Sequence, residues 1–339
     1  MTVLGIETSC DETSVAVLAD GHVRSNVISS QLIHSKYGGV VPELASRAHI
    51  RLIVGVVEEA LERAGITKSD LSGVAVTHGP GLAGALLVGL SFAKAIAYGL
   101  RIPLVGVNHL EGHLYSNFLA GHTPSFPFLS LIVSGGHSML VHVEKPFVHK
   151  ILGETRDDAA GEAFDKVAKM LGLGYPGGPA VEKLATEGNP TAISFPRSYL
   201  EEGTYDFSFS GIKTSVLYYL RNKGLIDVDN AKAAIERRQL ADICASFQEA
   251  IVDVLVAKTM AAADHLAVDE ITLAGGVSAN SLLRNRMKQE ADRREMKLYF
   301  PDAEYCMDNG AMIAYAGWLK LKEGVQSDFR LNVLPNLSL

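Results

Sequence analysis

Two histidines four residues apart, His109 and His113, are the residues of this sequence best suited to chemistry. Side chains at this spacing lie on one face of a helix, so both imidazoles could bind the same metal ion. The same spacing is equally compatible with an ordinary core or surface pair. Two ligands do not complete a metal site, so further ligands must come from elsewhere in the chain.

Asp308 is the carboxylate that best completes the set. It precedes an expected helix over 309–322 and lies at or near the N-cap of that helix. Two histidines and one carboxylate, with open positions, suit iron(II) or zinc. His137 is a less favoured fourth ligand. A His-Glu-x-x-His peptidase motif is absent, because the acid of this stretch is Glu111, which points away from the ligand face.

Two glycine-containing turns are suited to binding an anion. The Ser134-Gly135-Gly136-His137 turn follows an expected strand, and the 275–280 turn follows another strand and opens a helix. Backbone N–H groups at such turns and at helix N-termini bind phosphate or carboxylate groups. Asn280, at the end of the second turn, could reach a base or a ribose.

A third glycine stretch, Gly79-Pro80-Gly81-Leu82-Ala83-Gly84, matches the dinucleotide fingerprint. That fingerprint needs an acid about 20 residues further on, for the ribose hydroxyl. No Asp or Glu occurs between Leu71 and Leu110. We therefore interpret the stretch as a backbone turn rather than an NAD site.

Two charged segments have an ordinary and a functional interpretation. Asp158, Glu162 and Asp165 fall near one face of an expected helix over 157–166, which is usually a solvated face. The segment 284–297 carries six basic side chains among three acidic ones. A solvated helix is the ordinary interpretation of that segment, and an RNA-facing surface is the alternative.

The order of elements is repeated along the chain. A strand, polar loop and strand over 3–18 has a counterpart over 128–143, and a strand, glycine turn and helix beginning at 73 has a counterpart beginning at 270. This repetition predicts two related α/β lobes with mixed sheets and a ligand site in the cleft between them. We place the N-terminal lobe at 1–108, with 308–339 packing back towards it, and the C-terminal lobe at 109–307.

Composition sets further limits on the function. The 339 residues include 31 basic and 38 acidic ones, a net charge of −7, so bulk charge alone does not predict nucleic-acid binding. Cys10, Cys244 and Cys306 are widely spaced, which indicates a reducing compartment. Without a basic leader or an uninterrupted membrane-spanning run, the sequence predicts a cytoplasmic protein with no membrane partner.

Taken together, these motifs resemble those of the bacterial TsaD family, the tRNA N6-adenosine threonylcarbamoyltransferases formerly labelled O-sialoglycoprotein endopeptidases. The resemblance implies the duplicated ASKHA fold shared by actin, hexokinase and the heat-shock chaperones. It extends over nearly the whole chain. The stretches that carry it are Gly5 to Thr13, Gly38 to Arg47, His109 to His113, Val133 to His137, Asp157 to Lys166, Asp206 to Lys213, Gly275 to Asn280 and Asp308 to Met312.

The resemblance also implies roles for individual residues. His109, His113 and Asp308 would bind one divalent metal, Fe²⁺ first and Zn²⁺ as the alternative. Archaeal and eukaryotic relatives have a tyrosine ligand where Ile132 stands, so this chain follows the bacterial pattern and leaves a position for water or substrate. The residues implied to bind threonylcarbamoyl-AMP are Ile132, Val133, Ser134, Gly135, Gly136, Asp165, Gly178, Glu182 and Asn280.

The implied reaction is metal-assisted acyl transfer. The threonylcarbamoyl group would pass to N6 of the adenosine next to the anticodon, in tRNAs that read codons beginning with A, and AMP would leave. Asp11 and Glu12, in the first loop, are our candidates for the group that takes the proton. The implied partners are tRNA, a paralogous TsaB-like protein of the same fold and a small TsaE-like P-loop ATPase.

Three other functions remain as alternatives. A small-molecule kinase or ATPase of the ASKHA fold would have similar glycine turns but no need of the two histidines. A metallopeptidase is disfavoured by the absent catalytic glutamate. A non-catalytic scaffold would be expected to lack the metal ligands, whereas this chain has all three.

Overall fold

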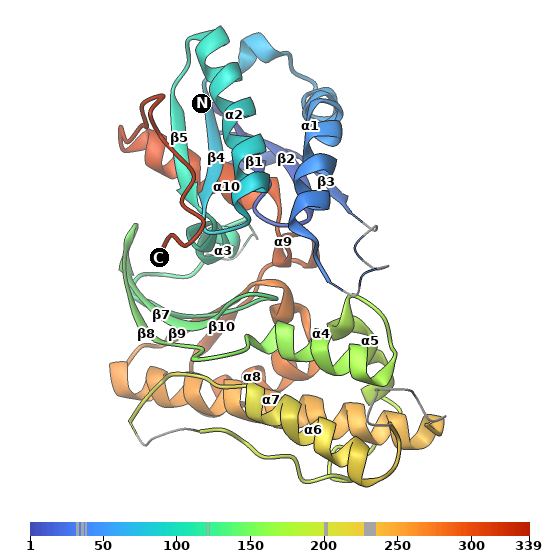
Figure 1. Ribbon diagram of the computed structural model, residues 1–339. Coiled ribbons are helices and arrows are strands. Elements are labelled where there is room, and N and C mark those ends of the chain that lie inside the picture. The colour runs from blue at the N-terminus through green and yellow to red at the C-terminus, as the bar shows by residue number, and fades with distance from the viewer. Residues whose placement is uncertain are drawn as a thin grey trace. The chain divides into compact units, whose positions relative to one another are not determined.

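The repeated order of strands and helices forms two α/β units in the computed structural model (Figure 1). Unit 1 consists of Met1–Thr123 and Pro301–Leu339, and unit 2 is the continuous segment Pro124–Phe300. The structure describes residues 1–31, 34, 37, 39–119, 121, 123–199, 203–226 and 235–339.

Unit 1 contains a mixed five-stranded sheet in the order β3-β2-β1-β4-β5. Strand β1 pairs antiparallel with β2 and parallel with β4, so the polar loop between β1 and β2 lies at the carboxyl end of β1. The strands are almost wholly buried at the centre of the sheet, as their β-branched runs predict. Their bounds are β1 (Thr2–Glu7), β2 (Glu12–Ala19), β3 (His22–Ser30), β4 (Gly73–Gly79) and β5 (Leu104–Asn108).

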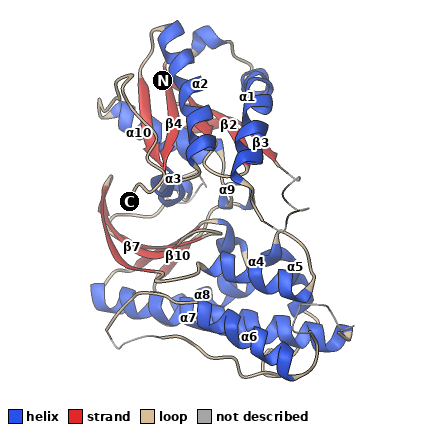
Figure 2. Cartoon of the chain, viewed as in Figure 1, coloured by secondary structure: helices blue, strands red, loops and turns tan. Residues whose placement is uncertain are grey.

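Helices cover both faces of this sheet (Figure 2). The side chains of α1 and α2 share a core with Leu4, Ile6 and Val74, whereas α10 packs on the opposite face against Ala16 and Leu18. The helices are α1 (Pro42–Ala64), the 3₁₀ turn η2 (Lys68–Asp70), α2 (Ala83–Leu100), α3 (His109–Ser116), α9 (Ala303–Cys306) and α10 (Gly310–Lys322).

Helix α2 is, within the described part of the chain, the one helix long and apolar enough to cross a bilayer on length and composition alone. Its Leu86 and Leu90 side chains are buried, and the helix packs against β4 and α1. The core helices of globular proteins meet the same criteria, so α2 is accounted for by its packing in unit 1.

Unit 2 repeats the topology of unit 1. Its sheet has the order β10-β9-β6-β7-β8, in which β6 pairs antiparallel with β7 and parallel with β9, as β1 does with β2 and β4. The repetition found in the sequence is therefore a structural duplication. The strands are β6 (Phe128–Val133), β7 (Ser138–Lys145), β8 (Val148–Glu154), β9 (Glu270–Ala274) and β10 (Lys297–Tyr299).

The core of unit 2 lies between its sheet and a layer of helices. The long helix α7 contributes Phe247, Ile251 and Leu255 to this core, and the ring of Phe247 packs edge-on against that of Phe164. The helices are α4 (Ala160–Leu171), α5 (Gly177–Ala185), α6 (Ser210–Asn222), α7 (Arg237–Leu266), the 3₁₀ turn η3 (Gly276–Ala279) and α8 (Ser281–Arg293).

The division between the units differs from the predicted lobe boundaries. Residues 109–123, which the prediction placed in the C-terminal lobe, belong to unit 1, as do residues 301–307. The reason is the packing of α3 against α10 and β5. A Cβ on Gly112 would lie 2.8 Å from Ile313 Cδ1, so glycine allows the two helices to approach closely.

The start of α10 agrees with the prediction, whereas that of α4 differs. The N-cap of α10 is Asn309, whose side chain accepts a hydrogen bond from Met312 N, so Asp308 lies next to the N-cap. Helix α4 begins at Ala160, so Asp158 precedes the helix instead of lying on its face. Both carboxylates are therefore available for other partners. Apolar residues at helical spacing also predict helices over 44–64 and 239–265, which are present as the slightly longer α1 and α7.

Candidate metal centre and ligand-binding turns

Helix α3 positions the two histidines. It begins directly after β5, and Asn108 caps it by accepting a hydrogen bond from Leu110 N at 2.8 Å. His109 and His113 are one turn apart, with ring centroids separated by 4.7 Å and ring planes at 83°. Both are buried, with 6% and 0% of their surface exposed. The predicted placement of the pair on one helix face is confirmed.

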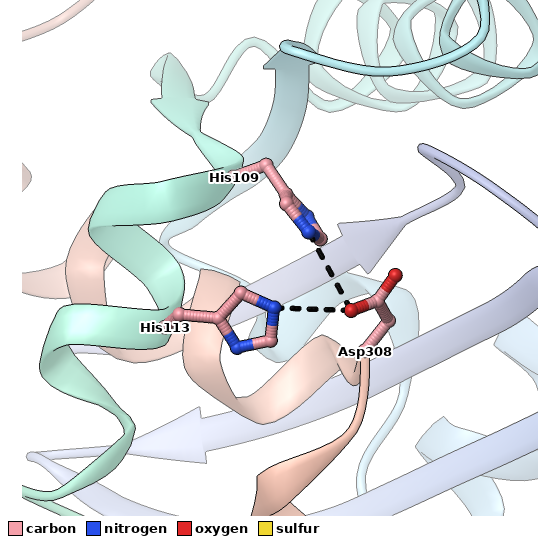
Figure 3. A group of neighbouring side chains, drawn as sticks. All are labelled: His109, His113 and Asp308. Atoms are coloured by element: carbon pink, nitrogen blue, oxygen red, sulfur yellow. Dashed lines mark hydrogen bonds and ion pairs between the residues drawn. The ribbon is translucent and has the colours of Figure 1, made fainter. Parts of the chain in front are cut away.

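Asp308 completes the group from the loop before α10 (Figure 3). Its Oδ1 atom lies 3.1 Å from His113 Nε2 and 3.5 Å from His109 Nε2. The three ligand atoms lie within 4.8 Å of one another. His137, the less favoured fourth ligand, is not part of this group.

The donor set fits a divalent metal. One carboxylate oxygen faces two imidazole nitrogens, an arrangement that is favourable only when protons or a cation lie between them. Burial alone would lower the pKa of His109, but the carboxylates of Asp308 and Glu7 raise it to about 9. The surroundings of His109 therefore favour a positive charge at this point, and two nitrogens with one carboxylate suit iron(II) or zinc.

Glu7 contacts His109 through Nδ1, the ring nitrogen that does not face Asp308. This carboxylate ends β1, is fully buried and accepts a hydrogen bond from His109 Nδ1 at 3.0 Å. Burial tends to raise the pKa of Glu7, but the charge and hydrogen bond of His109 and the hydroxyl of Thr77 hold it below its ordinary value. Residue types and spacing alone do not predict a role for Glu7, although Glu7 ends an expected strand beside the polar loop.

The candidate proton acceptors lie in the same unit: Glu12 is the first residue of β2, and Asp11 precedes it in the loop. Glu12 is 8% exposed. Burial raises the pKa of Glu12 above its ordinary value, and the charges of Asp308 and Asp11 raise it further. The carboxyl of Glu12 is therefore harder to ionise than an exposed glutamate.

Glu111 points away from the histidine face, as predicted. Its carboxylate pairs with the ammonium group of Lys320 at 2.6 Å, and both side chains are largely buried. The pair joins α3 to α10, the helix that follows Asp308. It therefore helps to fix the two segments that carry the metal-ligand candidates.

The first glycine turn lies in unit 2, between β6 and β7. Ser134 N donates to His137 O at 2.8 Å, and His137 N donates to Ser134 Oγ at 3.1 Å, which closes the turn. Gly135 and Gly136 are exposed, and a Cβ on either would meet no atom within 4 Å. Ile132 and Val133 are buried within β6, where both pair with β7, so the structure does not expose them to a ligand.

The second glycine turn is already engaged within unit 2. Asn280 Oδ1 caps α8 by accepting from Leu283 N at 3.0 Å, and its Nδ2 donates to Gln248 Oε1 at 2.9 Å. Glu182 accepts hydrogen bonds from both N and Oγ of Ser281. These contacts hold the start of α8 in place. A ligand that bound Asn280 or Glu182 would therefore have to compete with them.

Asp165 and Gly178 lie close together in the same unit. Asp165 Oδ1 accepts from Gly177 N at 2.6 Å and so holds the first turn of α5 against α4. Gly178 meets no atom within 4 Å at its Cβ position. The structure thus gathers the metal-ligand candidates in unit 1 and the predicted ligand-binding residues in unit 2.

Comparisons with solved structures confirm the fold. The full-length HypF structure in its phosphate- and nucleotide-bound form has a TM-score of 0.63 at 15% identity, covering 96% of this chain and 47% of HypF. An activator of 2-hydroxyisocaproyl-CoA dehydratase from Clostridium difficile has a TM-score of 0.51 at 13% identity, covering 97% of this chain and 99% of the activator. The chain has the duplicated ASKHA fold.

Comparisons of sequence identify the family. A relative from Salinibacter ruber, named tRNA N6-adenosine threonylcarbamoyltransferase, is 56% identical over the full length of both chains. A relative of the same name from Desulfitobacterium hafniense is 54% identical over 100% of this chain and 98% of its own. The TsaD family, described as tRNA N6-adenosine threonylcarbamoyltransferase, matches residues 22–315. The chain therefore belongs to the TsaD family of transferases.

Proposed function

We propose that this transferase moves the threonylcarbamoyl group from threonylcarbamoyl-AMP to N6 of the adenosine next to the anticodon. The tRNA substrates would be those that read codons beginning with A, and AMP would be released. The observation that carries the proposal is the buried group of His109, His113 and Asp308 in a chain that matches this family over most of its length.

The chemistry explains why such a group is useful. The exocyclic amine of adenine is a poor nucleophile, so the carbamoyl carbon must be made more electrophilic and its developing oxyanion stabilised. A divalent metal bound by His109, His113 and Asp308, Fe²⁺ first and Zn²⁺ second, would polarise the carbonyl oxygen of the threonylcarbamoyl group.

Backbone groups and side chains of unit 2 would together orient the adenylate. Backbone N–H groups of the Ser134 to Gly136 turn would donate to its phosphate, because the two glycines leave the backbone uncovered. Gly178 would allow an equally close approach at the start of α5. Asp165, Glu182 and Asn280 would complete the pocket, the last two by exchanging their present contacts for the ribose.

The proton of the attacking amine needs an acceptor. N6 forms the new bond to the carbamoyl carbon, the bond from that carbon to the phosphate oxygen breaks, and AMP leaves with the electron pair. Asp11 or Glu12 would take the proton lost by N6. Glu12 would become an acceptor only when a cation beside Asp308 lowers its raised pKa.

The partners belong to the same proposal. We include tRNA as substrate, a TsaB-like paralogue and a small TsaE-like ATPase, in the cytoplasm and without a membrane partner. The cysteines Cys10, Cys244 and Cys306 are all free thiols, which supports a reducing compartment. The alternative of a small-molecule kinase gains nothing from the family match.

The test supplies threonylcarbamoyl-AMP, tRNA and active partner proteins, and measures threonylcarbamoyladenosine in digested tRNA by mass spectrometry. We expect the wild-type chain to form it and His109→Ala and Asp308→Ala to lose at least about 100-fold in rate, a loss of ~2.7 kcal/mol of transition-state stabilisation. Formation at wild-type rate by either variant, with unchanged metal content, would falsify the assignment of the centre.

A further inference from the structure

The Glu7 carboxylate has three hydrogen-bond donors directed at it. Its Oε2 atom accepts from His109 Nδ1 at 3.0 Å and from Thr77 Oγ1 at 2.6 Å, and its Oε1 atom accepts from Ser9 N at 2.5 Å. These donors come from the loop after β1, from β4 and from α3. The carboxylate is therefore held in one orientation against the imidazole ring.

The contact with Glu7 determines which nitrogen of His109 carries hydrogen. An ionised carboxylate can only accept hydrogen bonds, so Nδ1 must carry a hydrogen atom and the neutral ring has its lone pair on Nε2. Nε2 is the nitrogen that faces Asp308, at 3.5 Å. The tautomer that Glu7 selects is the one able to bind a metal through Nε2.

The second histidine has no such support within the described part of the chain. His113 Nε2 faces Asp308, whereas its Nδ1 atom is buried and has no hydrogen-bond partner there. Glu7 thus acts on one ring of the pair. Any effect of Glu7 on metal binding should therefore require His109 but not His113, which can be tested.

We propose that Glu7 is a positioning residue that fixes the tautomer and ring orientation of His109 and thereby sets the affinity of the centre for a divalent metal. The inference rests on the proposed function only in taking His109 as a metal ligand. Groups that hold the far nitrogen of a ligating histidine typically change metal affinity about 10- to 100-fold when they are replaced.

The experiment measures Zn²⁺ affinity of the purified full chain by competition with a chromophoric chelator at constant pH. In Glu7→Gln the side chain keeps its size, but its NH₂ group must face either His109 Nδ1 or Ser9 N, both of which need an acceptor. We expect Zn²⁺ to bind this variant about 10- to 100-fold more weakly. Thr77→Val, which removes one donor but keeps the carboxylate, should lose less than Glu7→Gln.

The matched control is Glu270→Gln in unit 2. Glu270 is also buried, at 7% exposure, and accepts a hydrogen bond from Ser125 N, but it is not part of the metal group. This variant should bind Zn²⁺ as the wild type does. A loss equal to that of Glu7→Gln would show that removing any buried carboxylate weakens binding, and would overturn the proposal.

A double-mutant cycle separates positioning from general destabilisation. Glu7→Gln should change Zn²⁺ affinity by less than about 2-fold in a His109→Ala background, because the ring it orients is gone, and should keep its full effect in a His113→Ala background. Equal losses in both backgrounds, or wild-type affinity of Glu7→Gln itself, would overturn the proposal.

Two further measurements distinguish the remaining outcomes. If Glu7→Gln does not fold, Glu7→Asp replaces it: the shorter side chain keeps the charge but withdraws from His109, and wild-type affinity in that variant would also overturn the proposal. If the wild-type chain binds Zn²⁺ but forms no threonylcarbamoyladenosine, the proposed function fails and the role of Glu7 stands. If Asp308→Ala and His109→Ala bind Zn²⁺ as the wild type does, both fail.

Discussion

At the scale of single residues, the main feature is one carboxylate oxygen shared by two imidazoles. Asp308 Oδ1 lies 3.1 Å and 3.5 Å from the two Nε2 atoms, and the three residues are largely buried. Burying charged groups is costly unless they are paired with one another or with a metal. Metal binding should therefore stabilise the folded protein measurably.

The first prediction concerns metal removal. Zn²⁺ at 100 times its dissociation constant should stabilise the wild-type chain by about 2.7 kcal/mol, and a chelator should reverse this. Asp308→Ala should gain less than about 1 kcal/mol at the same Zn²⁺ concentration, because its affinity is lower. Thermal unfolding with and without chelator measures both. An equal metal-dependent shift in the variant would exclude Asp308 as a ligand.

Residue types and spacing predicted the histidine pair and its carboxylate, but not Glu7. A helical repeat places His109 beside His113 whatever the tertiary structure. The contact between Glu7 and His109 depends instead on β1 lying beside β4 and on α3 following β5 directly. Those relations are tertiary, and the sequence alone does not state them.

At the scale of elements, helix starts hold the turns in place. The first turn of α4 lies against the Ser134 turn: Gly161 N donates to Ser134 O at 3.2 Å, and a Cβ on Gly161 would lie 2.5 Å from that oxygen. The glycine is required by close backbone packing rather than by an unusual backbone angle.

The second prediction follows from this contact. Gly161→Ala should destabilise unit 2 by about 1–3 kcal/mol, despite the higher helix propensity of alanine, because backbone must move. It should also raise the KM for threonylcarbamoyl-AMP. Gly211→Ala is the control, since a Cβ there meets no atom within 4 Å. Denaturant unfolding measures the change in unfolding free energy, and steady-state kinetics measure the KM. Equal values for Gly161→Ala and Gly211→Ala would contradict the packing argument.

The third prediction concerns the start of α6, which Asp157 caps from outside the helix. It accepts hydrogen bonds from the backbone N of Phe209 and Ser210 and from the hydroxyls of Ser208 and Ser210. Partial burial raises the pKa of Asp157, but these hydrogen bonds outweigh that effect and lower it. Asp157→Asn should cost about 1 kcal/mol of unfolding free energy at pH 7.

The pH dependence of that cost has a definite sign. Because the folded pKa is lowered, the stabilisation is present above the unfolded carboxyl pKa of about 3.9 and is lost as the pH falls through the folded value. The difference between wild type and Asp157→Asn should therefore persist from pH 7 to about pH 4 and shrink below it. Asp292→Asn, an exposed site in α8, serves as the control. A difference that is the same at pH 7 and pH 3 would contradict the assignment.

The sequence pattern predicted the long helices well, but it predicted the first residues of shorter helices less well. Apolar spacing fixes the body of α1 and α7, whereas the starts of α4 and α10 depend on single capping contacts. Asn309 and Asp308 are both good capping residues, and only tertiary contacts decide between them. The position of the cap matters because the Asp308 carboxylate contacts the two histidines, whereas Asn309 caps the helix.

At the scale of the whole molecule, three basic side chains of the segment 284–297, in and after α8, are paired with carboxylates. Arg286 contacts Glu249 and Asp253, Arg294 contacts Asp264 and Glu290, and Lys297 contacts Glu270. These contacts favour the ordinary interpretation of the segment over an RNA-facing surface. Phosphate binding would have to displace carboxylates first.

The fourth prediction tests that interpretation. Replacing Arg286 and Arg294 together with Gln should change tRNA affinity by less than about 2-fold and leave its salt dependence unaltered. The unfolding free energy should fall by about 1 kcal/mol or less per pair, since these side chains are partly exposed. A loss of tRNA affinity with a shallower salt dependence would instead assign α8 to the RNA surface.

The duplicated topology was predictable from the repeated hairpins and glycine turns, whereas the division of the chain was not. The lobe boundary predicted from the sequence ended the N-terminal lobe at residue 108, where the strand pattern ends. Unit 1 continues through α3 because Gly112 lets that helix pack on α10. The boundary therefore follows the packing of α3 on α10 and β5, which the repeat in the sequence does not show.

The insertion of unit 2 within unit 1 also has a consequence for biosynthesis. Asp308 follows His113 by 195 residues, so at ordinary translation rates it is made about 10 to 40 s later. During that interval both histidines exist without their carboxylate, and the face of the first sheet that α10 covers is bare. The group of two histidines and one carboxylate can therefore be completed only after Asp308 has been made, near the end of synthesis.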